Sequence, residues 1–137
     1  MRWILLVVAM VGIATSSAAL REHYRTDSSP CSINDKWDCG IVNHSPYAVF
    51  GGVPVAIIGI AGYALLGALA VKRSWRLVCV AAFMGLMFSL YLTYIEAAEL
   101  RVWCIYCVIS LCVISTFSIL ATSRLLADLV RRKPASA

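Results

Sequence analysis

Residues 102–123 read VWCIYCVISLCVISTFSILATS, an uncharged apolar run with a Cys-x-x-Cys motif near its beginning. A run of this length is long enough to cross a bilayer as one helix, because about 20 apolar residues span the hydrocarbon layer. Cys104 and Cys107 are then expected on one face of the first turns of that helix, at the boundary between lipid and water. The partial positive charge of a helix N-terminus favours thiolate over thiol. The motif therefore has the position expected of a reactive dithiol.

Three more stretches contain no Asp, Glu, Lys or Arg, at residues 4–20, 53–71 and 77–95. Of the 137 residues, 61% are hydrophobic and 14% are charged, which is unusual for a water-soluble domain. We therefore predict an all-α membrane protein, a single domain over residues 1–137 whose four transmembrane helices lie at these three ranges and at 102–123. The long polar segment at residues 21–52 is expected to be an outer loop. It would carry a short surface helix at residues 46–50, capped by Ser45.

The first apolar run has two interpretations. Residues 17–19, Ser-Ala-Ala, resemble the cleavage site of a signal peptide. The run is equally compatible with an uncleaved first helix. We favour the uncleaved helix, because the remaining three helices would form a thin bundle.

The net charge of +5 indicates membrane topology rather than a nucleic-acid partner. With four crossings, both termini and the loop at residues 72–76 lie on one side of the membrane. That side holds eight of the twelve basic residues: Arg2, Lys72, Arg73, Arg76, Arg124, Arg131, Arg132 and Lys133. Basic residues concentrate on the cytoplasmic side, so both termini are predicted to be cytoplasmic, and no nucleic-acid binding is expected.

This topology gathers four of the six cysteines on the outer, oxidising side of the membrane, where disulfides persist: Cys31, Cys39, Cys104 and Cys107. The other two, Cys79 and Cys112, fall inside apolar runs and are predicted to be buried and inert.

Three interpretations of the four outer cysteines are open. A zinc site would need two more ligands beside the motif, but the loop pair lacks the usual Cys-x(2–4)-Cys spacing, so no metal is expected. A structural interpretation gives a non-catalytic four-helix scaffold with permanent disulfides. A redox interpretation passes electrons from a partner dithiol to Cys31 and Cys39, then to Cys104 and Cys107, and then to a lipid-soluble quinone.

The sequence resembles the vitamin K epoxide reductase family in its short bacterial form. The resemblance runs from about Cys31 to Thr116. It rests on the Cys-Ile-Tyr-Cys motif, on the seven residues between the loop cysteines and on a serine six residues after the second of them. Further matching positions are Cys31, Trp37-Asp38-Cys39, Val42, Ser45, Tyr47-Ala48, Gly52-Val53-Pro54-Val55 and Gly59.

The resemblance implies a four-helix bundle around a quinone pocket that opens toward the outer side. It implies that Cys104 and Cys107 are the active-site pair, with Cys107 nearest the quinone ring. It also implies that Cys31 and Cys39 are a shuttle pair, and that Cys39 bonds Cys104 in transit.

The resemblance places Ser45 by the pocket, where it would hold or polarise the quinone. Tyr47 and Phe50 are further candidates for the pocket. The animal enzymes have a pocket asparagine where Tyr47 or Ala48 falls here, and a tyrosine that is replaced by Leu111. We therefore expect reduction of a ubiquinone or menaquinone, rather than of vitamin K epoxide, as the main activity.

The expected partner follows from the same resemblance. Many bacterial relatives carry a fused thioredoxin-like domain, and this chain ends at Ala137 without one. A separate extracytoplasmic thioredoxin-like protein is therefore expected to supply the electrons, in the bacterial cytoplasmic membrane. The outcome would be disulfide formation in exported proteins. Glu96 and Glu99 are candidate proton donors near the quinone, although a solvated connection between helices is the preferred interpretation of both.

Overall fold

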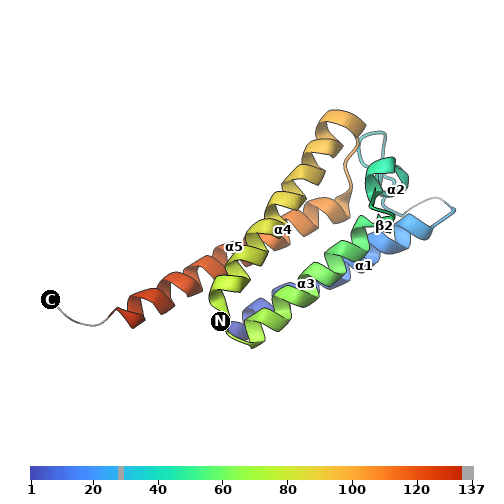
Figure 1. Ribbon diagram of the computed structural model, residues 1–137. Coiled ribbons are helices and arrows are strands. Elements are labelled where there is room, and N and C mark those ends of the chain that lie inside the picture. Colours follow the sequence, from blue (N-terminus) through green and yellow to red (C-terminus); the bar gives the residue numbers. More distant parts are fainter. Residues whose placement is uncertain (28–29, 134–137) are drawn as a thin grey trace.

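The computed structural model describes residues 1–27 and 30–133, so residues 134–137 of the predicted domain lie outside the described residues. Within the described chain, four long helices form an elongated bundle: α1 (Arg2–Tyr24), α3 (Val55–Val71), α4 (Trp75–Ile95) and α5 (Ile105–Arg132). Helices α1 and α3 run side by side, and α5 extends beyond the other helices at its C-terminal end (Figure 1).

Short elements connect α1 to α3 at one end of the bundle. They are the six-residue helix α2 (Cys39–His44), the 3-10 turn η1 (Pro46–Ala48) and the antiparallel strands β1 (Val49–Phe50) and β2 (Val53–Pro54). Gly51 and Gly52 make the hairpin turn at positive φ, which glycine adopts without strain. The predicted surface helix at residues 46–50 is thus only a three-residue turn, and α2 was not predicted.

Each predicted long helix is present, but the ends differ from the predicted ranges. α1 and α5 continue past the apolar runs, because polar residues extend a helix as readily as apolar ones do. At the end of α5, Arg132 Nε lies 3.0 Å from Asp128 Oδ2, one turn away. α3 begins only at Val55, because residues 53 and 54 pair with β1.

The centre of the bundle is an apolar core shared by the long helices. α1 packs against α3 and α5, and α4 packs against α5. Leu5, Tyr63, Val78 and Phe117 are buried in this core, one from each long helix. The Tyr63 hydroxyl donates a hydrogen bond to the carbonyl oxygen of Ser110 at 2.9 Å, which ties α3 to α5.

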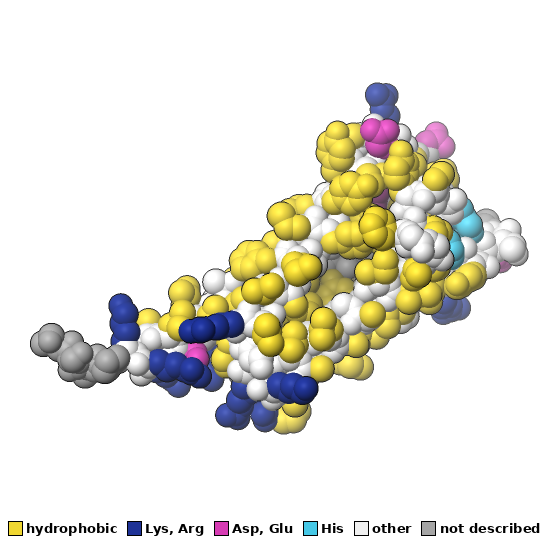
Figure 2. All heavy atoms as spheres, viewed as in Figure 1, with side chains coloured by type: hydrophobic (Ala, Val, Ile, Leu, Met, Phe, Trp, Pro, Cys, Tyr) yellow, Lys and Arg dark blue, Asp and Glu magenta, His cyan; other side chains and the backbone are white. Residues whose placement is uncertain are grey.

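Apolar side chains also cover much of the outside. Within the described part of the chain, three helical segments are long and apolar enough to cross a membrane: Arg2–Tyr24, Trp75–Leu100 and Ile105–Arg132. Helix α3 is equally apolar but shorter, with 17 residues. Large apolar side chains such as Met10, Met84 and Ile119 are exposed, and hydrophobic atoms dominate the middle of the molecule (Figure 2). The prediction of an all-α membrane protein is confirmed.

Charged side chains gather at the two ends of the bundle. Most Lys and Arg side chains lie at the end that holds the N-terminus, the turn from α3 to α4 and the end of α5 (Figures 1 and 2). The other end, which holds α2 and the end of α1, carries His23, His44 and most of the acids visible in Figure 2. The apolar middle therefore separates a basic end from an end with both signs of charge.

A close approach of α1 to α3 gives a test of this packing. A Cβ added at Gly12 would overlap the ring of Tyr63, and that ring is held in place by its bond to Ser110. We expect Gly12→Ala to destabilise the fold by about 1–3 kcal/mol, because an overpacked core must shift. The measurement is the thermal unfolding temperature in detergent.

Gly62→Ala is the matched control, since an added Cβ there meets nothing within 4 Å. It should unfold at the wild-type temperature. Equal stability of the two variants would contradict the close contact between α1 and α3.

Candidate active site

A short backbone pairing brings the loop after α1 to the beginning of α5. The N–H of Trp103 donates to the carbonyl oxygen of Lys36 at 2.7 Å, and the N–H of Asp38 donates to the carbonyl oxygen of Trp103 at 3.0 Å. Cys39 follows Asp38 in the chain, and Cys104 follows Trp103. The pairing therefore sets these two cysteines beside each other.

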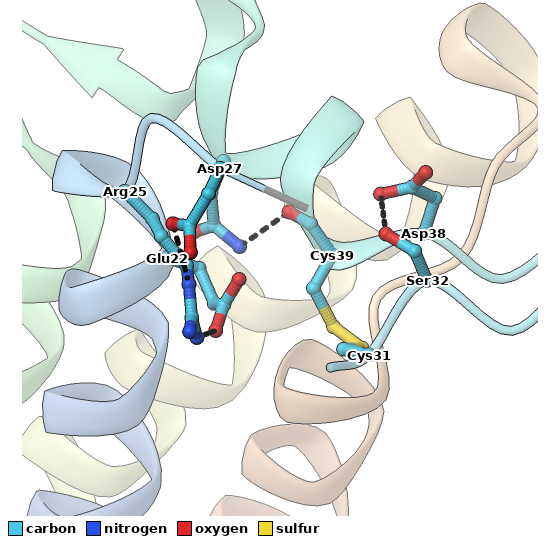
Figure 3. Close-up of polar contacts among 8 residues, drawn as sticks. Glu22, Arg25, Asp27, Cys31, Ser32, Asp38 and Cys39 are labelled. Atoms are coloured by element: carbon cyan, nitrogen blue, oxygen red, sulfur yellow. Dashed lines mark hydrogen bonds and ion pairs between the residues drawn. A yellow bond between two sulfur atoms is a disulfide. The ribbon is translucent and has the colours of Figure 1, made fainter. Parts of the chain in front are cut away.

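All four cysteines predicted for the redox site lie together. Cys31 and Cys39 form a disulfide with their Cα atoms 5.5 Å apart (Figure 3). Both residues belong to one buried cluster with Val42 and Cys104, and Cys107 packs against that cluster. Cys39 and Cys104 are fully buried, whereas Cys31 is 5% exposed. Cys31 is thus the more accessible sulfur of the disulfide.

Asp38 fixes the geometry of the disulfide loop. It is the N-cap of α2, where its Oδ1 accepts from the N–H of Ile41 at 3.2 Å. The same oxygen accepts from the hydroxyl of Ser32 at 2.9 Å, across the loop from Cys31 to Cys39 (Figure 3). Asp38 therefore has a structural role in this loop.

The loop begins at an ion-paired end of α1. Arg25 Nε lies 3.0 Å from Asp27 Oδ1, and its Nη1 lies 3.5 Å from Glu22 Oε1 (Figure 3). The hydrogen bond from Arg25 lowers the pKa of the exposed Asp27 carboxyl. Glu22 is buried in spite of its charge, so this pair holds a carboxylate at the boundary of the bundle.

Asn43 of α2 is a buried site residue that was not predicted. Its side-chain amide donates to the carbonyl oxygen of Cys39 at 2.8 Å and to Sγ of Cys104 at 3.6 Å. Its backbone carbonyl oxygen accepts from Nδ1 of His23 at 2.6 Å, which ties α2 to α1. An amide donor aimed at a sulfur stabilises the thiolate form. In the sequence, Asn43 stands four residues after Cys39. That spacing puts both residues on one face only if the segment is helical, and α2 was not predicted.

Cys104 is the N-cap residue of α5 rather than part of its first turn, and Cys107 is the third helical residue. The hydrogen bond from the Cys107 thiol lowers the pKa of Cys104, although burial and the nearby Glu96 oppose this shift. The backbone N–H groups of Cys107 and Tyr106 act in the same direction. Cys104 is therefore the thiol that ionises first.

A cavity of about 560 Å³ opens among α1, α3, α4 and α5, within the size range of sites for small molecules. Its walls are mainly aliphatic and aromatic, with Met84, Phe88 and Leu92 from α4. Cys107 and Asn43 also line the cavity. The sulfur cluster and the cavity thus meet at these two residues.

The residues predicted to bind a quinone have different surroundings. Tyr47 and Cys107 line the cavity. Phe50 is 62% exposed, and its ring contacts that of Phe88 with centroids 6.4 Å apart.

Phe50 is not among the residues that line the cavity, and neither are the other two predicted residues, Ser45 and Leu111. The Ser45 hydroxyl donates to the carbonyl oxygen of Val42 at 2.7 Å, at the end of α2. Leu111 packs against the main apolar core. Their predicted roles stay predictions.

Glu96 is buried at the end of α4, where the π-helical segment η2 (Glu96–Leu100) begins. It is 2% exposed and lines the cavity, so its interpretation as a solvated residue is wrong. Its Oε2 accepts from the N–H of Cys104 at 3.1 Å, and its side chain also interacts with the thiol of Cys107. Within residues 1–27 and 30–133, its Oε1 has no hydrogen-bond partner. Glu99 is exposed, as expected of a connecting segment.

The two cysteines outside the predicted redox site differ in burial. Cys79 is buried as predicted, but Cys112 is exposed, because it lies on the outer face of α5. Among the side chains that the structure describes, no three His, Cys, Asp or Glu residues form a metal-binding group.

Comparison with known proteins gives one family. The model described as "Vitamin K epoxide reductase family" matches residues 3–122 of the 137-residue chain. The matched range contains all six cysteines and the residues around the cavity. A search of curated proteins found no significant match.

The role of Asn43 is open to a direct test. Asn43→Leu keeps the size of the side chain but removes the donor to Cys104, so the pKa of Cys104 is expected to rise toward its ordinary value of 9.0. At a fixed pH below that value, the thiolate fraction should therefore fall. The measurement is the pH titration of thiolate absorbance in the reduced chain, after subtraction of the same titration for Cys104→Ser.

His44→Gln is the control, because His44 is an exposed neighbour on α2 whose hydrogen bond is to the carbonyl oxygen of Gly40. It should titrate as the wild type does. An unchanged titration in Asn43→Leu would show that the amide does not stabilise the thiolate.

Proposed function

The chain belongs to the vitamin K epoxide reductase family, and on this premise we propose that it is a membrane thiol:quinone oxidoreductase that supports disulfide formation. Family membership indicates an oxidoreductase. One observation carries the finer proposal, which is the contact between two cysteine pairs at the wall of an apolar cavity. Cys39 of one pair is clustered with Cys104 of the other, and Cys107 lines the cavity.

The first step takes electrons from a partner dithiol, which we assign to a thioredoxin-like protein. A partner thiolate attacks Sγ of Cys31, because Cys31 is more exposed than Cys39. The second partner thiol then resolves the mixed disulfide. The partner leaves oxidised, and Cys31 and Cys39 are left as thiols.

The second step moves the electron pair inward. Cys39 attacks Sγ of Cys104 in the oxidised Cys104–Cys107 pair, and Cys107 leaves. Cys31 then attacks Cys39, and Cys104 leaves. The lowered pKa of Cys104 makes it a good leaving group. The arrangement with Cys31 and Cys39 bonded, and Cys104 and Cys107 reduced, corresponds to the stage after this transfer.

The third step delivers the electrons to a quinone in the cavity. The residues present fit such a group, because apolar walls from α3 and α4 suit its ring and tail, and Asn43 and Tyr47 offer polar side chains. A bound quinone supplies an acceptor for two electrons and two protons. Cys107 lines the cavity, whereas Cys104 is not among its lining residues, so Cys107 is the thiol that faces the acceptor.

The proposed topology has four crossings, with Cys31, Cys39, Cys104 and Cys107 on the extracytoplasmic side. Helix α3 is about 25 Å long at 1.5 Å per residue, close to the roughly 30 Å of the hydrocarbon layer. The basic end of the bundle is then cytoplasmic. The sulfur cluster at the opposite end faces the oxidising side, which agrees with the disulfide between Cys31 and Cys39.

The active-site pair is tested by substitution. Cys104→Ala or Cys107→Ala is expected to lower quinone reduction by roughly 10³-fold or more, because neither remaining thiol can form the disulfide that releases both electrons. The measurement is quinone-dependent oxidation of a reduced thioredoxin-like protein by the purified chain. Cys112→Ala is the matched control on the same helix and should keep the wild-type rate. Full turnover in either active-site variant would contradict the assignment.

The shuttle is tested by trapping. Cys31→Ala leaves Cys39 without its resolving thiol, so a Cys39–Cys104 disulfide should accumulate and be found by peptide mass spectrometry. Small thiols that reach the inner pair directly should still reduce quinone through this variant. A fixed Cys104–Cys107 bond that resists mild reductant would instead favour a non-catalytic scaffold.

The topology is tested with an impermeant maleimide on intact cells. A cysteine introduced as Glu99→Cys, near the sulfur cluster, should add label to that of the parent chain. Lys72→Cys, in the turn between α3 and α4, should add label only after the membrane is opened. Both positions are exposed, so access depends on the side of the membrane. Labelling of both in intact cells would overturn the proposed arrangement.

A further inference from the structure

Glu96 is a buried acid beside the sulfur cluster that the proposed electron path does not use. We infer that Glu96 carries one of the two protons of the redox cycle, as a carboxylate while Cys104 and Cys107 are bonded and as a carboxylic acid while they are reduced. The inference rests on the proposed function. It assigns a catalytic residue beyond the four cysteines.

The contacts of Glu96 suit this role. Its Oε2 is held by the N–H of Cys104, so the carboxyl group is fixed at the beginning of α5. Its other oxygen, Oε1, has no hydrogen-bond partner within the described chain, and the side chain interacts with the thiol of Cys107 and lines the cavity. A fixed oxygen beside both the thiol and the acceptor site is the arrangement that a proton carrier needs.

Charge in the cavity requires such a carrier. When the pair is reduced, the thiolate of Cys104 is stabilised by Cys107, Asn43 and the first N–H groups of α5. No Lys or Arg is found among the described residues that line the cavity. A carboxylate beside this thiolate would be a second buried anion with no cation among the lining residues described, which is strongly unfavourable. Glu96 therefore takes up a proton when the thiolate forms.

The reduction step balances with this proton. The thiols of Cys31 and Cys39 give two electrons and two protons, and they become a disulfide. The electrons break the bond between Cys104 and Cys107. Of the two protons released by Cys31 and Cys39, one goes to Cys107 and the other to Glu96, while Cys104 is left as the thiolate. The site therefore holds one negative charge throughout, on the Glu96 carboxylate before the step and on the Cys104 thiolate after it.

The oxidation step balances in the same way. The thiolate of Cys104 and the thiol of Cys107 lose two electrons and form their disulfide. The Cys107 proton and the Glu96 proton pass to the two oxygens of the quinone, which leaves as the quinol. Glu96 returns to the carboxylate, so the buried charge is again −1. Without Glu96, the site would hold one proton too few.

Infrared spectroscopy tests the protonation without any quinone. The full chain in detergent is reduced with dithiothreitol, and the reduced-minus-oxidised difference spectrum is recorded. The carbonyl stretch of a carboxylic acid should appear on reduction in the wild type and be lost in Glu96→Gln. Gln keeps an oxygen that accepts from the N–H of Cys104, so a merely structural role would be preserved. Glu99→Gln, the exposed acid of the same segment, should keep the band.

Rapid mixing with a soluble quinone tests the proton transfer. Reoxidation of the reduced pair should be about 100-fold slower in Glu96→Gln, because general acid catalysis contributes at least that factor. Glu99→Gln should react at the wild-type rate. Should Glu96→Gln fail to fold, Glu96→Asp keeps the carboxyl group on a shorter chain, and it should show the infrared band at a shifted frequency and a reduced rate.

The outcomes separate the two proposals. Three infrared results would overturn the role of Glu96. They are the absence of the band from the wild type, its survival in Glu96→Gln, and its appearance at the wild-type frequency in Glu96→Asp. A wild-type rate of reoxidation in Glu96→Gln would do the same. A wild-type chain that reduces no quinone, yet shows the Glu96 band, would contradict the proposed function instead.

Discussion

The backbone pairing of Trp103 with Lys36 and Asp38 is the contact on which the site depends. It joins a polar loop to the segment just before α5, and because Asp38 and Trp103 are 65 residues apart, it must offset the entropy of closing that long segment. The paired residues Asp38 and Trp103 directly precede Cys39 and Cys104 in the chain. A slip of the pairing by one residue would separate Cys39 from Cys104, and the electron path proposed above would be broken.

Burial at this contact has two consequences for the chemistry. It excludes water from the centre of the sulfur cluster, where Cys39 and Cys104 are fully buried. It also makes charge expensive, which is why the site contains donors aimed at Cys104 and an acid beside Cys107. These groups are also fixed by the local fold, because the Asn43 amide donates to the carbonyl oxygen of Cys39 within α2, and Glu96 accepts from the N–H of Cys104.

Several features were predictable from the sequence because they depend on local properties. The apolar runs gave the long helices, and the cysteine spacing led to the two pairs. The ends of helices were less predictable. An apolar run predicts the part of a helix that contacts lipid and not the residue at which the helix ends. Helix α1 accordingly continues to Tyr24, and α5 to Arg132. Helix α2 has only six residues, and the local sign of its beginning is a single capping residue, Asp38.

The sequence by itself determined the all-α membrane architecture, the separation of a basic end from an end with both signs of charge, and the candidate redox cysteines, since hydrophobicity and charge act additively along the chain. Only the tertiary structure decided which polar side chains face the sulfurs. Asn43 and Cys104 are 61 residues apart, and Glu96 is buried while Glu99 is exposed within one short segment. Such choices depend on how the helices pack around a shared cavity, and a linear pattern of residue types does not contain that information.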